Sequence, residues 1–133
     1  MSVSCDLGGA KVTTAGGDHG TSSETFSAIA HTGISFQQGG TTDGCVNLSF
    51  SAEALAPGAT LMEVRAVLDD SVEASPGPVY FAREDDVLRS RAFNFLFPGV
   101  APGPHRVEVH FRSTGEPGTV RIGTRTTMVQ YVR

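Results

Sequence analysis

The segment His105-Arg-Val-Glu-Val-His-Phe-Arg112 alternates polar and apolar residues without interruption. Successive side chains of a β-strand point to opposite faces, so this pattern predicts a strand with one dry and one wet face. Val107, Val109 and Phe111 form the dry face, which we expect to pack in a hydrophobic core. The wet face carries Arg106, Glu108, His110 and Arg112.

Three other segments follow the same rule, namely residues 45–52, 61–68 and 91–97. In the last of these the apolar face consists of three phenylalanines, each of which buries on the order of 150–250 Å² when it lies in a core. We therefore expect this strand to anchor the core through Phe93, Phe95 and Phe97. Weaker strand patterns cover residues 3–13, 24–31, 34–36, 79–81, 119–122 and 126–132, and the last two read as a hairpin or as one kinked strand.

Helix signals are scarce. Residues 51–56 contain good helix formers, but Pro57-Gly58 limits them to a short helical turn. Residues 56–58 and 98–104 combine Pro with Gly, and we expect hairpin-like corners or crossings between the two sheets there. Strands that follow one another without helices predict antiparallel sheets. The sequence therefore predicts an all-β fold, a single domain over residues 1–133, built as an antiparallel two-sheet β-sandwich of jelly-roll type with eight or nine strands.

The net charge of −4 disfavours a nucleic-acid partner, because phosphate binding needs a basic face. The charge is unevenly distributed: residues 53–86 are strongly acidic, whereas residues 105–133 are basic. This polarity is typical of a solvated surface, and it would also let one copy of the chain meet another.

Cys5 and Cys45 are the only cysteines, and three states remain open for them: a disulfide, two buried thiols or links between subunits. They do not predict a zinc site, since no closely spaced ligands accompany them. The N-terminus lacks the pattern of a signal peptide, and no apolar run is long enough to span a membrane. We expect no membrane partner, and a location in the cytoplasm or in an assembled particle or surface structure.

No catalytic motif is present, and the sequence predicts no catalytic, cofactor-binding or metal-binding residue, and no cofactor. A hydrolase would need a deep polar pocket around His105 or His110. The acidic segments 69–70 and 84–86 read as solvated turns, with calcium as the alternative. Exposed aromatic residues for stacking against sugars are restricted to Tyr80 and Tyr131. The polar, glycine-rich segments 16–23 and 37–44 are either mobile tips or contacts in an assembly.

Five segments of residues 45–133 form a recurring pattern of strands and corners. They are Cys45-Val-Asn-Leu-Ser-Phe-Ser-Ala-Glu-Ala54, Val64-Arg-Ala-Val-Leu-Asp69, Phe93-Asn-Phe-Leu-Phe-Pro-Gly-Val-Ala-Pro-Gly-Pro-His105, Arg106-Val-Glu-Val-His-Phe-Arg112 and Arg125-Thr-Thr-Met-Val-Gln-Tyr131. This part of the chain resembles a recurrent, largely uncharacterised family of bacterial β-sandwich domains. The layout is also loosely similar to the jelly rolls of C1q and tumour necrosis factor, which tend to be trimers.

These observations favour a non-enzymatic module that self-associates as a structural component of a particle, filament or surface assembly. We expect a homo-oligomer, and the resemblance to C1q and tumour necrosis factor implies a trimer. The alternative is a module that binds a ligand, either a glycan or calcium, or the surface of another protein.

Overall fold

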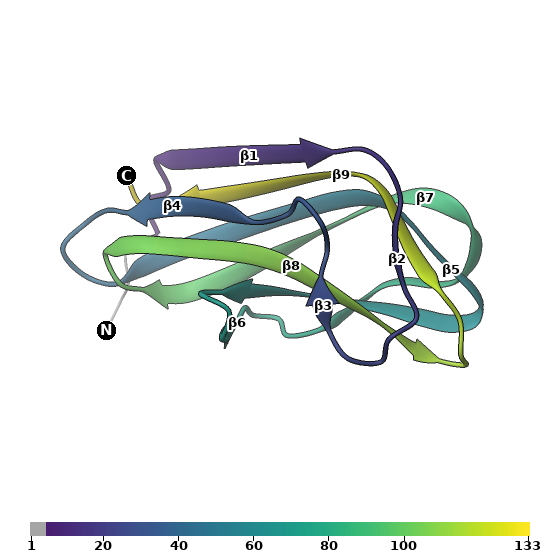
Figure 1. Ribbon diagram of the computed structural model, residues 1–133. Coiled ribbons are helices and arrows are strands. Elements are labelled where there is room, and N and C mark those ends of the chain that lie inside the picture. Colours follow the sequence, from purple (N-terminus) through teal and green to yellow (C-terminus); the bar gives the residue numbers. More distant parts are fainter. Residues whose placement is uncertain (1–4) are drawn as a thin grey trace.

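The computed structural model describes residues 5–133, and these residues form an all-β structure (Figure 1). The described chain has no helix with the length and apolar character needed to cross a membrane. The nine strands are β1 (Gly9–Ala15), β2 (His19–Thr21), β3 (Ser27–Ala28), β4 (Ile34–Gln38), β5 (Gly44–Leu68), β6 (Val72–Glu73), β7 (Val79–Val100), β8 (Gly103–Gly115) and β9 (Val120–Tyr131).

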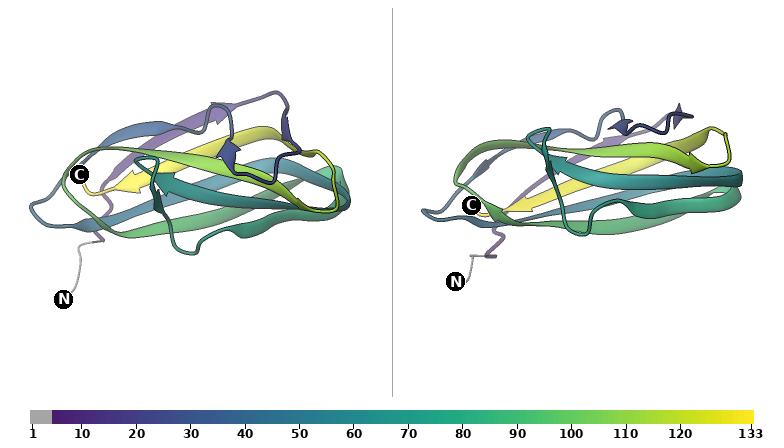
Figure 2. Two further views of the ribbon diagram at one scale, coloured as in Figure 1. Left: turned by 60° about the horizontal axis from the view of Figure 1, so that its bottom comes forward. Right: turned by 90° about the horizontal axis from the view of Figure 1, so that it is seen from below.

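Strands β5 and β7 are much longer than the others and pair with each other antiparallel along most of their length. Along its other edge, β5 pairs first with β9, from Asn47 to Leu55, and then with β8, from Thr60 to Leu68. Both long strands turn back at one end of the elongated molecule, as Figure 2 shows from two sides. The register between them shifts at this bend, on either side of Ala56. The result is one curled antiparallel sheet in which every strand is hydrogen-bonded to a neighbour.

The inner face of this curled sheet holds the core. On β8, Val107, Val109 and Phe111 are fully buried, as the alternation predicts, while the polar residues between them stay partly accessible. The apolar rows of β5 and the end of β7 pack against them. The largest fully buried side chains are Phe50, Phe95, Phe97, Phe111, Ile29, Leu48 and Met62.

Cys5 and Cys45 form a disulfide, which decides among the three states that the sequence leaves open. The bridge joins the segment before β1 to the first residues of β5, 40 positions later. A cross-link of this kind typically contributes roughly 2–4 kcal/mol by restricting the unfolded chain.

The helical turn expected at residues 51–56 is wrong, because β5 runs through it. Residues 56–58 form no hairpin-like corner; they lie at the bend where β5 passes from its pairing with β9 to its pairing with β8. Gly58 takes a positive φ of 58°, and its N–H donates to Asp86 on β7 rather than closing a turn. The hydroxyl of Thr60 donates to the carbonyl of Pro57 at 2.6 Å. The Pro-Gly pair therefore bends a paired strand, because bulges in both strands absorb the irregularity.

Four further expectations need correction. The two separate sheets are not found, since hydrogen bonding continues from one half of the molecule to the other through β5 and β7. Residues 84–86 lie within β7 and not in a loop. Of residues 24–31, only Ser27–Ala28 form a strand. The strand expected at residues 3–13 begins only at Gly9, and its first two positions fall outside the described residues.

The three phenylalanines of β7 do not share one environment. Phe95 and Phe97 are buried as expected, whereas Phe93 is 38% exposed. Phe93 lies opposite Phe50 on β5, so it has the predicted face, but β7 is at the edge of the sheet and no strand of the described chain covers its other side. Its ring rests instead against the ring of Phe95, with centroids 5.2 Å apart.

Replacing each of these two rings with alanine tests the assignment. We expect Phe95→Ala to lower the free energy of unfolding by roughly 3–5 kcal/mol, because it empties a packed site in the core. Phe93→Ala should cost less than about 1.5 kcal/mol, since the ring is partly solvated already. Urea denaturation of both variants measures the difference, and equal losses would contradict the described burial.

Candidate functional site

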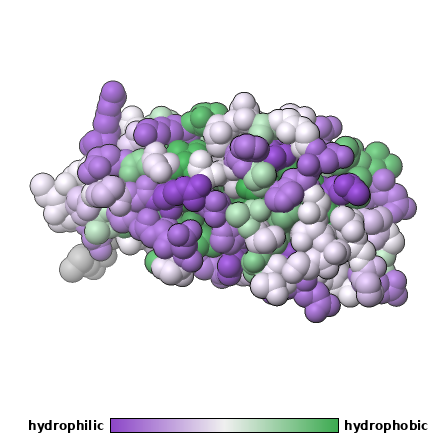
Figure 3. Space-filling view, in the orientation of Figure 1, coloured by the Kyte–Doolittle hydropathy of each residue, from purple (hydrophilic) through white to green (hydrophobic). Residues whose placement is uncertain are grey.

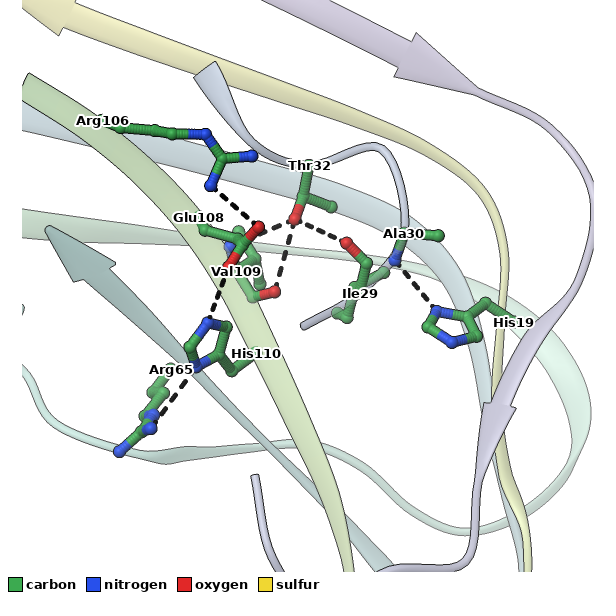
Figure 4. Close-up of polar contacts among 9 residues, drawn as sticks. All are labelled: His19, Ile29, Ala30, Thr32, Arg65, Arg106, Glu108, Val109 and His110. Carbon is green, nitrogen blue, oxygen red and sulfur yellow. Dashed lines mark hydrogen bonds and ion pairs between the residues drawn. The ribbon is translucent and has the colours of Figure 1, made fainter. Parts of the chain in front are cut away.

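The polar face of β8 is a chain of ion pairs and hydrogen bonds rather than a set of free side chains (Figure 4). Arg106 donates to Glu108 at 3.0 Å, and Nε2 of His110 donates to the other oxygen of the same carboxylate at 3.0 Å. Nδ1 of His110 accepts from Arg65 on β5 at 3.3 Å. Burial alone would raise the pKa of Glu108, but the bonds from His110 and Arg106 outweigh it and lower that pKa.

An aromatic ring covers part of this face. The guanidinium groups of Arg65 and Arg112 each lie 4.3 Å from the centroid of the Phe26 ring, which precedes β3. Such cation–π contacts orient the two arginines. Arg112 also bonds to Glu63, and Arg65 to Glu73. Of the charges on the wet face, Arg112 therefore contacts the segment that crosses this face, residues 26–32, which we call the crossing segment.

The crossing segment is fixed to β8 by buried polar groups as well, which Figure 4 also shows. The Thr32 hydroxyl donates to the carbonyl of Ile29 at 2.8 Å and accepts from the N–H of Val109 at 3.1 Å. The N–H of Ala30 donates to Nδ1 of His19 at 2.9 Å. Burial lowers the pKa of His19, and Arg125 and His31 lower it further, so its ring stays available as an acceptor.

His105 joins two turns to the start of β8. Its Nδ1 lies 2.6 Å from Asp69 Oδ2 and its Nε2 lies 2.7 Å from the carbonyl of Ala101. Both partners are acceptors, so only the doubly protonated ring donates to both. Burial lowers the pKa of His105, but these two hydrogen bonds outweigh it and raise the pKa above its usual value. The N–H of Arg106 donates to the other oxygen of Asp69.

The raised pKa of His105 predicts a pH-dependent contribution to stability. The contribution is fully present below the pKa of an unfolded histidine, about 6.5, and is lost as pH rises through the higher folded value. We expect His105→Gln to lower the free energy of unfolding at pH 5.5 by roughly 1.5–3 kcal/mol, the usual range for a hydrogen bond to a charged group. At pH 9 the loss should be clearly smaller. Chemical denaturation at both pH values measures the loss, with His31→Gln as the exposed control. A loss independent of pH would contradict the two hydrogen bonds from a doubly protonated His105.

Arg125 on β9 is a buried charge that sequence analysis does not identify as important. It is 3% exposed and donates to the carbonyls of Gly17, Ala30 and Gly123 at 2.8–3.0 Å. Burial lowers its pKa. Arg125 shares its face of β9 with the buried residues Thr127 and Val129. This place in the alternation is the sequence signal from which its burial could be predicted. Arg125 fixes the glycine-rich segment after β1, which favours an ordered loop over a mobile tip.

The outer surface has a cleft of about 420 Å³ between β5, β7 and β9. Nε of Arg91 is buried in its wall without an acceptor among the described residues, although the same guanidinium bonds to Asp85. A second hollow, of about 340 Å³, is mostly apolar and lies between β6 and the end of β7. Neither hollow is lined by His105 or His110. The cleft is lined by Ser51, Ala52, Glu53, Ser90, Arg91, Thr124, Arg125 and Thr126.

One aspartate in each acidic segment proposed for calcium uses its oxygens internally. Asp69 accepts from His105 and Arg106, and Asp85 forms ion pairs with Arg89 and Arg91. No three His, Cys, Asp or Glu side chains within residues 5–133 gather as metal ligands. The two tyrosines differ: Tyr131 packs against the core, whereas Tyr80 is exposed on β7.

The most unusual surface feature is the outer edge of β7. Within the described chain, β7 pairs with β5 alone, apart from one bridge in which Ser75 and Leu96 exchange two hydrogen bonds of 2.8 Å. Seven large apolar side chains of the described chain are exposed, and five of them lie on this strand. Figure 3 shows apolar side chains gathered at the end of the molecule where β7 bends. The five are Tyr80, Val87, Leu88, Phe93 and Leu96.

Comparison with known proteins identifies the fold and not a family. No protein-family model and no curated protein matches the chain. Among solved structures, the C-terminal domain of EclA, described as a sugar-binding protein, is similar with a TM-score of 0.52 and 10% sequence identity over 85% of this chain and 78% of that one. The VP2 subviral particle of infectious bursal disease virus gives a TM-score of 0.53 at 10% identity, over 92% of this chain. This chain spans about a third of VP2, 33% of its length. These jelly-roll-like neighbours bear out the expectation of an all-β fold, and the missing family match is consistent with the expected uncharacterised family.

Proposed function

We propose that this chain is a non-enzymatic jelly-roll module that self-associates as a structural component of a particle, filament or surface assembly. The edge of β7 carries the proposal, because it combines unpaired backbone groups with exposed apolar side chains.

The strand pairing supports the jelly-roll assignment. If β5 and β7 are each divided at their bend, β1, β9, the first half of β5 and the second half of β7 form one layer. The other layer then contains β4, β8, the second half of β5 and the first half of β7. Eight strands in this order follow the two interlocked Greek keys of a jelly roll. The layers are the two halves of one continuous sheet, joined at the bend.

Natural sheets usually protect their edges, since unpaired N–H and C=O groups pair readily with another chain. β1 shows such protection: Lys11 shares the inner side of the sheet with Val129, and its ammonium group donates to the carbonyl of Ser35. The segment Ala92–Phe95 of β7 has no charge and no partner on its outer side within the described chain. We infer that the native partner of this edge lies in another molecule.

The similarity to VP2, which forms a subviral particle, is compatible with this proposal, although it extends to the fold alone. The trimer implied by the resemblance to C1q and tumour necrosis factor stays a prediction. The proposal places the protein in an assembled structure and assigns it no catalysis.

Light scattering over a wide range of protein concentrations tests self-association. We expect the wild-type mass to rise above that of one chain, and Val87→Lys to weaken association at least tenfold, or about 1.4 kcal/mol, by placing a charge in the apolar contact. Val12→Lys is the matched control, since Val12 is equally exposed (58% against 57%) on β1, the other edge. A wild-type protein that stays monomeric at millimolar concentration would contradict the proposed function.

The cleft between β5, β7 and β9 supports a second candidate, a glycan-binding module. Its hydroxyl groups, one carboxylate and the unpaired Nε of Arg91 are groups that hydrogen-bond sugars. Thermal shift and titration calorimetry against a glycan panel test it. A binder should lose affinity at least tenfold on Glu53→Gln and not on Glu116→Gln, and a panel without any binder would contradict this candidate.

A further inference from the structure

The exposed stretch of β7 has an ordered distribution of charge. Three acidic residues, Glu84–Asp86, precede Val87 and Leu88, and the basic residues Arg89 and Arg91 follow them. The stretch therefore changes from negative to positive across two exposed apolar residues. An antiparallel second copy of the same stretch has the opposite order, so the acids of each copy would face the arginines of the other.

The charges in this stretch are only partly neutralised within one molecule. Asp85 is the acceptor for both arginines, 2.6 Å from Arg89 Nε and 2.7 Å from Arg91. Glu84 and Asp86 are exposed and form no ion pair within the described chain. The Arg89 side chain is 64% exposed, so most of its surface can meet a partner. One molecule thus presents two unpaired acids on one side of Val87-Leu88 and an accessible guanidinium on the other.

We propose that β7 docks against β7 of a second copy about a two-fold axis that passes between Val87 and Leu88. This inference rests on the proposed self-association and names its surface and partner. Val87 and Leu88 of the two copies meet at the centre, while Asp86 of each copy faces Arg89 of the other and Glu84 faces Arg91. Further out, the exposed ring of Phe93 falls beside Ala82 and Arg83, where a guanidinium can stack on it.

The structure limits how far this contact extends. Beyond Phe95, Leu96 is already hydrogen-bonded to Ser75, and Pro76 and Pro78 next to it have no N–H to donate. At the other end of the stretch, the first acid, Glu84, has a positive φ of 47°, which marks a bulge. The N–H of Val87 already donates a hydrogen bond to Asp85. Side chains at the bend therefore provide most of the contact. A two-fold contact uses the same patch on both copies, so it closes and yields a dimer.

A charge-exchange experiment tests this arrangement directly. Arg89→Glu places an acid opposite Asp86 of an identical copy, and Asp86→Lys places a base opposite Arg89 of an identical copy. Each variant alone should self-associate at least tenfold more weakly than the wild type, because like charges face each other. An equimolar mixture should recover association to within about threefold of the wild type, since the introduced acid at position 89 then faces the introduced base at position 86. Arg121→Glu, an exposed arginine on β9, is the control for net charge and should leave association unchanged.

The outcomes separate this inference from the proposed function. Light scattering on labelled mixtures should give the mass of a dimer and a heterodimer of the two variants. Wild-type association that neither variant weakens would overturn the β7 contact and leave self-association standing. Weakening without recovery in the mixture, or a trimer that both variants leave intact, would likewise overturn the two-fold arrangement. A monomeric wild type would overturn both proposals.

Discussion

The pairing of β5 with β7 determines the rest of the structure. Two strands of 25 and 22 residues stay hydrogen-bonded through a bend, and each contributes to both walls of the core. β8 and β9 share the remaining edge of β5, and within residues 5–133 no strand pairs with the outer side of β7. The same constraint that encloses the phenylalanine core therefore leaves one long edge open. The proposed interface is a consequence of the topology and not an addition to it.

Much of the fold is predictable from the sequence, because alternation is a local property. The segment 105–112 specifies both its buried row and its polar row, and β8 has them as predicted. Continuity of the strands is a different matter. Pro57-Gly58 is a local signal for a turn, but the long β5–β7 pairing on both sides of it keeps the chain extended. The exposure of Phe93 also depends on which strand lies at the edge, and periodicity contains no information on that.

The polar residues also divide into those that local alternation predicts and those whose role depends on tertiary contacts. The wet face of β8 is predictable, but its cover is not, since Phe26 is distant in the sequence from both arginines that it contacts. The roles of His105 and Asp69 depend on two turns that meet only in the folded protein. Arg125 looks like an ordinary strand residue until its three carbonyl partners are placed around it. These residues stabilise the scaffold, whereas the exposed part of β7 contributes little to it and is free to bind.

The most direct test of this account is hydrogen–deuterium exchange of the β7 backbone at low and high protein concentration. Those amides of residues 84–94 that are not hydrogen-bonded to β5 should exchange quickly in the monomer and become protected as association proceeds, while those of β1 exchange at the same rate throughout. Protection that appears on β1 or on the polar face of β8, with β7 unchanged, would contradict the claim that β7 is the edge through which this protein associates.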